Sequence, residues 1–155
     1  MRKIVIFEDE PYIIDTMQMI DLRRLAKELN ISTEEIMSHL IFATDWVDFE
    51  TKFESTAEMK NALQEVDTIF LDHSMPRGNG DFVYKRLADL GYDGPLFGTS
   101  TGRDIDGHSP QDAYIKDEKR VTKENLAKEV CNTLRKMILE ERELSSELVE
   151  NDSLK

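Results

Sequence analysis

Five short apolar runs, separated by stretches of helical length, constrain the fold of this chain more than any other feature. They occupy residues 4–7, 40–43, 68–71, 96–99 and 113–115. Within each run the apolar residues follow one another almost without interruption, which is typical of strands buried on both faces of a parallel sheet. Because right-handed crossovers place helices on both faces, we predict a doubly wound α/β domain with five parallel strands in the flavodoxin-like order 2-1-3-4-5.

The segments between these runs carry helix signals. Pro11 suits a first helical turn, and apolar residues at three- and four-residue spacings continue to Leu29. Ser32 and Glu35 have the form of a capping box, which predicts an extra short helix over residues 33–39, before the second strand. Helices are also predicted on either side of the third strand. Residues 101–111 are dense in turn residues, so no full helix is expected there.

Length and charge limit the classes of function. A chain of 155 residues is expected to fold as one compact domain. Its net charge of −12 argues against binding to nucleic acid or to an anionic membrane surface. The lone Cys131 cannot form an internal disulfide, and no apolar stretch reaches the length of a membrane span or a signal-peptide core. These features predict a cytoplasmic protein.

Side chains suited to metal and phosphoryl chemistry gather at the carboxyl ends of the predicted strands, where doubly wound sheets bind ligands. In chain order they are Glu8, Asp9, Asp72, Thr99, Ser100 and Lys116. Carboxylates from two strands suit Mg²⁺, and a hydroxyl and an ammonium group nearby suit phosphoryl oxygens. Each residue also has a structural explanation, such as a turn or a strand end, and Glu10 is assigned to the dipole of the following helix.

Two motifs resemble the signatures of response-regulator receiver domains. Residues 7–11 read Phe-Glu-Asp-Glu-Pro, similar to the acidic signature of that family. Residues 72–76 read Asp-His-Ser-Met-Pro and are followed by Gly80, similar to the phosphoacceptor strand and loop. The resemblance extends over about residues 3–135, so we expect a receiver domain over residues 1–138 and an acidic helical extension and tail over residues 139–155.

The resemblance implies a role for each residue of these two motifs. Asp72 would be the phosphorylated nucleophile. Glu8 and Asp9 would form the acidic pair that binds Mg²⁺ together with Asp72. The backbone carbonyl of Ser74 would be a further metal contact.

The resemblance also extends to the last two predicted strands. Residues 95–101 are similar to the fourth strand of the family, with Ser100 at its hydroxyl position and Thr99 as the alternative register. Residues 113–116 are similar to the fifth strand, with Tyr114 as the switch aromatic and Lys116 as the lysine of the site. This region departs from the family pattern in two ways. Tyr114 and Lys116 are one residue closer together than is usual in the family, and the segment between Ser100 and Lys116 is short for a fourth helix.

The implied function is a stand-alone phosphoacceptor switch in a two-component phosphorelay. A histidine kinase or phosphotransfer protein would donate a phosphoryl group from its phosphohistidine to Asp72, and a downstream protein would read the result. The chain would catalyse only its own phosphorylation and dephosphorylation. The alternative, motivated by the two departures, is a phosphorylation-independent pseudo-receiver that mediates protein contacts. A magnesium-dependent phosphatase is disfavoured, because His73 and Ser74 follow Asp72 where a second acid would be needed.

A long final helix is predicted from Thr122, with about 27 residues free of Gly and Pro. Leu134, Met137, Leu144 and Leu148 fall at heptad-like spacing. This pattern predicts either a weak homodimer through the protruding helix or a solvated tail. The acids along it would repel a second copy, so pairing should rise with ionic strength.

Overall fold

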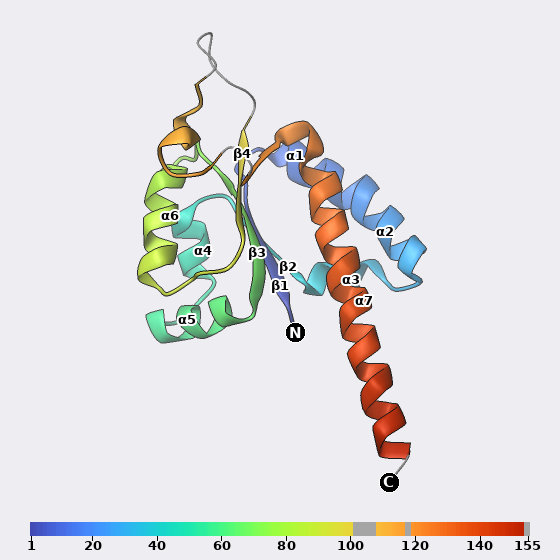
Figure 1. Cartoon of the computed structure of the whole chain (residues 1–155). Coiled ribbons are helices and arrows are strands. Elements are labelled where there is room, and N and C mark those ends of the chain that lie inside the picture. Colours follow the sequence, from blue (N-terminus) through green and yellow to red (C-terminus); the bar gives the residue numbers. More distant parts are fainter. Residues whose placement is uncertain (101–107, 117–118, 154–155) are drawn as a thin grey trace.

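The computed structural model of the chain contains a single five-stranded sheet, all of it parallel, with strand order β2-β1-β3-β4-β5 (Figure 1). It describes residues 1–100, 108–116 and 119–153, and for Ser100 only the backbone. The strands are β1 (Lys3–Phe7), β2 (Leu40–Ala43), β3 (Val66–Asp72), β4 (Leu96–Ser100) and β5 (Arg120–Thr122). The predicted fold class and strand order are confirmed.

Helices cover both faces of the sheet (Figure 1). One face carries α1 (Pro11–Thr16), η1 (Met17–Asp21), α2 (Leu22–Leu29), α3 (Thr33–Ser38) and α7 (Leu126–Ser153). The other carries α4 (Trp46–Thr51), α5 (Thr56–Gln64) and α6 (Gly80–Asp89). Among the described residues, the 3-10 helices η2 (Pro110–Ala113) and η4 (Lys123–Asn125) flank β5 in the chain. The extra helix before β2 is confirmed, and the Ser32 hydroxyl caps it by accepting from the Glu35 amide at 3.0 Å.

Each face of the sheet has its own apolar core. Alternate residues of β1 divide between them: Ile4 and Ile6 belong to the core with α2 and α7, whereas Val5 and Phe7 belong to the core with α4, α5 and α6. All four side chains are buried. This two-sided burial explains why the strands read as nearly continuous apolar runs.

The first helical segment contains a π-turn. Residues Met17–Asp21 form η1, between α1 and α2. The turn accommodates the break in spacing between Ile20 and Leu22, since Met17 and Leu22 are both buried although they are five residues apart, and Ile20 is exposed. The segment therefore keeps one apolar side facing the sheet through a change of helical register.

The predicted fifth strand at residues 113–115 is wrong. Residues Pro110–Ala113 form η2, and β5 lies at Arg120–Thr122, paired with Gly98, Thr99 and Ser100 of β4. β5 has three residues, and its only aliphatic residue is Val121. The apolar run at 113–115 instead supplies Ile115, which is buried beneath Gly98 of β4. Residues 101–107, part of the segment predicted to lack a full helix, lie outside the described residues.

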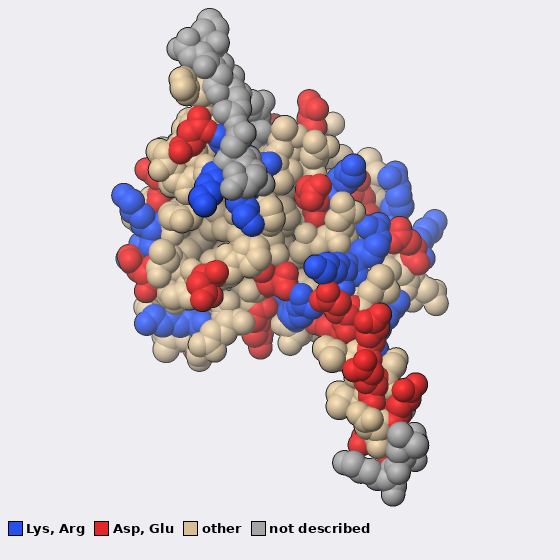
Figure 2. Space-filling view, in the orientation of Figure 1, with Lys and Arg blue, Asp and Glu red and all other residues tan. Residues whose placement is uncertain are grey.

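α7 extends beyond the sheet it covers (Figure 1). Leu134 and Met137 are buried in the core, whereas Leu144 and Leu148 are exposed. The predicted heptad seam is therefore divided, with its first half committed to the domain and its second half on the projecting part, where acidic side chains gather (Figure 2). Among the described residues, no helix combines the length and the apolarity that a membrane crossing needs.

Candidate phosphoacceptor and metal site

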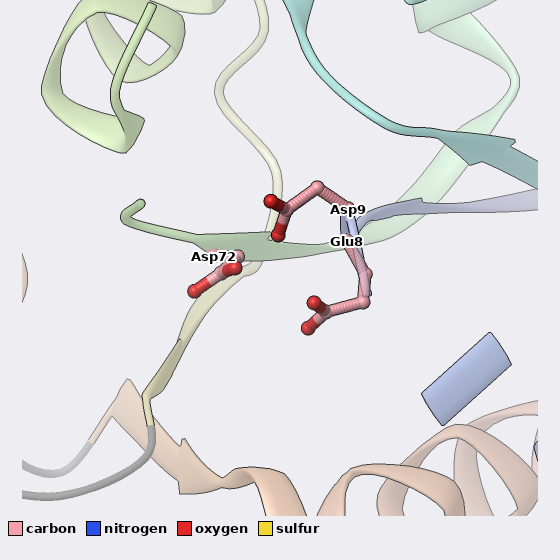
Figure 3. A group of neighbouring side chains, drawn as sticks. All are labelled: Glu8, Asp9 and Asp72. Carbon is pink, nitrogen blue, oxygen red and sulfur yellow. The ribbon is translucent and has the colours of Figure 1, made fainter. Parts of the chain in front are cut away.

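Three carboxylates converge at the carboxyl end of the sheet (Figure 3). Glu8 and Asp9 follow β1, and Asp72 is the last residue of the neighbouring β3. One carboxylate oxygen from each lies within 4.8 Å of the others. Glu8 and Asp72 are buried, and Asp9 is half-buried. Glu8 and Asp72 are 64 positions apart in the sequence, and the pairing of neighbouring parallel strands brings them together.

A lysine lies against this cluster. The Lys123 ammonium group is 3.2 Å from Asp72 Oδ2 and 3.3 Å from Glu8 Oε1. Lys123 is the first residue after β5, whose pairing with β4 carries the chain to the carboxyl end of the sheet. Only 15% of the Lys123 side chain is exposed. The site thus contains a cation held between two buried acids.

Burial and mutual repulsion set the protonation of these acids. Burial raises the pKa of Glu8 to about 7, and the nearby Asp72 carboxylate adds to this rise. Burial also raises the pKa of Asp72, while Lys123 opposes the rise. Burial alone would lower the pKa of Lys123, but Asp72 and Glu8 together raise it. The cluster therefore carries more negative charge than one lysine can stabilise.

The donor set fits a hard divalent cation. Glu8 Oε1 accepts hydrogen bonds from the Glu10 amide at 3.1 Å and from Lys123, whereas the buried Glu8 Oε2 has no hydrogen-bond partner among the described residues. A buried carboxylate oxygen without a partner is costly, and a cation would satisfy it. Oxygen ligands alone are what Mg²⁺ prefers. Glu8, Asp9 and Asp72 are the residues that would hold it.

The loop after Asp72 folds tightly over the end of β3. Asp72 Oδ1 accepts from the His73 amide at 2.8 Å, and the Gly80 amide donates to the His73 carbonyl at 2.7 Å. A Cβ on Gly80 would lie 2.5 Å from the Asp72 carbonyl oxygen, so glycine is required at this close approach. The Tyr114 hydroxyl lies 2.8 Å from His73 Nδ1 on the same loop.

The structure places the remaining predicted site residues at different distances from the cluster of acids, in the loop, on β4 and after η2. Ser74 lies in the loop, two residues after Asp72. The Thr99 side chain is buried on β4 beside Asp72, and its hydroxyl has no partner within the described part of the chain. Ser100 ends β4, and its side chain lies outside the described residues. Tyr114 contacts the loop after Asp72 from the end of η2 and not from β5.

The placement of Lys116 at the site requires correction. Lys116 is exposed in the chain segment after η2, and the ammonium group in contact with Asp72 is that of Lys123. The error follows from the misplaced strand. The sequence held no clear signal for the correct position, because a strand at 113–115 leaves only residues 116–121 before the predicted final helix, and a connection of that length is ordinary.

Comparison with solved structures agrees with this architecture. The receiver domain of the Francisella response regulator 1452 is similar over 92% of this chain and 98% of its own, with 17% identity and a TM-score of 0.50. A CheY-like response regulator receiver domain protein from Methanospirillum hungatei JF-1 matches over 86% of this chain and 97% of its own, with 14% identity and a TM-score of 0.42. No protein-family model and no curated protein sequence matches the chain. The chain has the fold of a response-regulator receiver domain.

Proposed function

We propose that this protein is a phosphoacceptor switch of the two-component type, with Asp72 as the phosphorylated residue. The observation that carries the proposal is the cluster of Glu8, Asp9 and Asp72 at the carboxyl end of β1 and β3, with their carboxylate oxygens within 4.8 Å. Such an arrangement suits phosphoryl transfer, which needs both a bound metal ion and an ionised carboxylate as the nucleophile. The likeness in fold to the Francisella receiver domain supports it.

In the proposed reaction an Asp72 carboxylate oxygen attacks the phosphorus of a phosphohistidine on a partner protein. A new O–P bond forms as the N–P bond breaks, and the electron pair of that bond stays on the imidazole nitrogen, which takes a proton from solvent. Mg²⁺, when bound by Glu8, Asp9, Asp72 and the Ser74 carbonyl, supplies positive charge against the phosphoryl oxygens.

The chain's own groups orient the nucleophile. The His73 amide fixes Asp72 Oδ1, and Lys123 contacts Asp72 Oδ2. Once the phosphoryl group is attached, Lys123 is the cation placed to pair with its oxygens. Ser100 is the proposed hydroxyl partner of the phosphoryl group and Tyr114 the proposed switch aromatic.

The proposal includes a histidine kinase or phosphotransfer protein as donor, an unnamed protein as target, and a cytoplasmic location. The protein acts only on itself, by phosphoryl transfer and autodephosphorylation. The proposal is tested by incubating the protein with magnesium and a small phosphodonor such as acetyl phosphate. We expect one acid-labile, hydroxylamine-sensitive phosphate in the native chain and none in Asp72→Asn, because the amide is neither an anionic nucleophile nor a good magnesium ligand.

Asp81→Asn is a matched control, since Asp81 lies in the first turn of α6, outside the carboxylate cluster. Labelling of Asp72→Asn at the native rate would refute the assignment of the nucleophile. A native chain that takes no label at all, with magnesium present, would favour the pseudo-receiver that acts through protein contacts alone.

A further inference from the structure

The loop between β3 and α6 is fastened to the end of β2 by an arginine. Arg77 Nε lies 2.7 Å from Asp45 Oδ2, and Arg77 Nη2 lies 3.1 Å from Asp45 Oδ1. Asp45 follows β2 by two residues and caps α4. The two parallel contacts form a bidentate pair, which fixes orientation as well as distance. This pair joins two segments that are 32 positions apart in the chain.

The carboxylate of this pair is a fixed anchor. Only 1% of the Asp45 side chain is exposed, and its Oδ1 also accepts from the Asp48 amide at 2.8 Å. Burial alone would raise the pKa of Asp45, but Arg77 and the Asp48 amide lower it, so the group is ionised at neutral pH. An ionised, buried and hydrogen-bonded carboxylate has one orientation, and it imposes that orientation on the arginine.

The same loop is also held by Met75 and by the Gly80 amide, besides the contact of His73 with Tyr114. Met75 is buried in the core that contains Ala43 and Trp46. The Gly80 amide closes the loop on the His73 carbonyl at 2.7 Å. Ser74 lies between these attachments, one residue after His73 and three residues before Arg77. The backbone at Ser74 therefore has little freedom while these attachments are intact.

We propose that Arg77 and Asp45 form a clamp that positions the phosphoacceptor loop, so that the Ser74 carbonyl is held ready for the cation. This inference rests on the proposed function, because it concerns the same metal site. Arg77 is a positioning residue: it acts through the loop backbone and does not contact the metal or the phosphoryl group. The clamp links the acidic site on β1 and β3 to the start of α4.

The test compares Arg77→Gln with Arg77→Lys and Asp45→Asn. Magnesium affinity is measured by calorimetry, and exchange of the Gly80 amide is followed by NMR in magnesium-free buffer. Arg77→Gln should bind magnesium about tenfold more weakly, as expected when an outer partner of a metal site is lost, and its Gly80 amide should exchange faster. Arg77→Lys keeps the charge without the fork and should lie between Arg77→Gln and the native chain. Asp45→Asn retains a capping residue and should resemble Arg77→Gln.

Arg135→Gln is the matched control. It removes another bidentate arginine pair, that between Arg135 and Glu28, whose contacts are 2.5 Å and 3.1 Å. That pair lies between α7 and α2 and is remote from the loop, so both measurements should stay at native values. The double variant Arg77→Gln/Asp45→Asn should bind magnesium no more weakly than either single variant, because the two residues act through one interaction.

The outcomes separate the clamp from the function on which it rests. Native magnesium affinity in a folded Arg77→Gln or Arg77→Lys protein would overturn the clamp. Native exchange of the Gly80 amide in these variants would overturn it as well, and that readout needs no metal. A native chain that binds no magnesium would instead refute the proposed metal site itself.

Discussion

The two ends of the β1–β3 pair each hold a cation among carboxylates, and they differ in burial. At the carboxyl end Lys123 lies between Glu8 and Asp72, with side-chain exposures of 15%, 0% and 5%. These three side chains are therefore little screened by water, although Lys123 also lies 3.9 Å from Glu10, whose side chain is 52% exposed.

At the amino end Arg2 contacts Asp67 of β3 and Glu140 of α7. The three side chains are 37%, 26% and 41% exposed. The Arg2 amide also donates to Glu141 at 3.1 Å. This cluster ties α7 to the amino-terminal end of the sheet and is open to solvent.

One pattern of charges thus serves two purposes according to its burial. Exposed ion pairs contribute little to stability, because water screens them and their long side chains must be ordered. In the buried cluster each charge depends on its partners, and removal of one leaves the others without compensation. The open end fastens the fold, whereas the enclosed end is electrostatically strained and suited to bind a further cation.

The largest expected effect comes from removing the buried cation. Lys123→Met leaves the carboxylates of Glu8 and Asp72 close together without a compensating cation, so at pH 8 without magnesium the free energy of unfolding should fall by roughly 3 kcal/mol. Urea denaturation monitored by circular dichroism measures it. Added magnesium should restore part of the loss, because the cation replaces the missing charge.

Lys116→Met is the control for this change. Lys116 is exposed, and its replacement should alter stability by less than about 0.5 kcal/mol. Equal losses in the two variants would show that Lys123 has no special place in the cluster and would remove the contrast between the two ends.

The next effect is the pH dependence of stability that Glu8 introduces. Its folded-state pKa of about 7 lies above its ordinary value of 4.5. Between these values the folded protein binds a proton that the unfolded chain releases, so stability should fall as the pH rises from about 4.5 to about 7, by up to roughly 3 kcal/mol. Glu8→Gln should lose most of this fall, and the remainder should come from Asp72. Denaturation midpoints across this pH range measure it, and identical slopes in the two proteins would contradict the assignment.

A smaller effect is expected at the open end. Arg2→Met should lower the free energy of unfolding by less than about 1 kcal/mol at low salt, and by less still at high salt, because screening already weakens the native pair. Urea denaturation at two ionic strengths provides the measurement. A loss as large as that of Lys123→Met would mean that exposure does not distinguish the two clusters.

The smallest effect concerns self-association of the projecting helix beside that open cluster. With Leu134 and Met137 committed to the core, only Leu144 and Leu148 remain of the predicted seam. Sedimentation of the full chain should reveal weak association that increases with salt, as screening relaxes the acidic repulsion. A chain cut after Ile138 should be monomeric. A dimer that survives the cut, or a monomer under every condition, would exclude this helix from any interface.

The carboxyl-end acids were predictable from the sequence because they follow strands with strong signals. β1 and β3 are buried on both faces, so their apolar runs locate Glu8, Asp9 and Asp72 to the residue. The first four strands, the short helix α3 and the long final helix were predicted for similar reasons. In these elements burial, spacing and capping all favour one structure.

The lysine of the site was not predicted, because β5 has no such signal. It is an edge strand of three residues, all of them half-buried or exposed, so its composition resembles that of a loop. The apolar residues nearby belong to the chain that packs under β4, where the buried Gln111 donates to the Leu71 carbonyl at 2.9 Å. A local pattern cannot separate packing of this kind from strand pairing. The contact between Lys123 and Asp72 arises from the tertiary structure and leaves no local pattern in the sequence.

The π-turn of the first helical segment separates two packing requirements. Each residue of an α-helix advances by about 100°, so one additional residue in a wide turn lets the two halves take different rotational phases. The helix α1 starts two residues after Asp9, and α2 packs against α7. These two helices therefore need not have the same rotational phase. A single-residue deletion within Met17–Asp21 would restore a regular helix but force one half to rotate out of phase with its neighbours. The additional residue therefore sets the rotation of α2 on the core separately from that of α1.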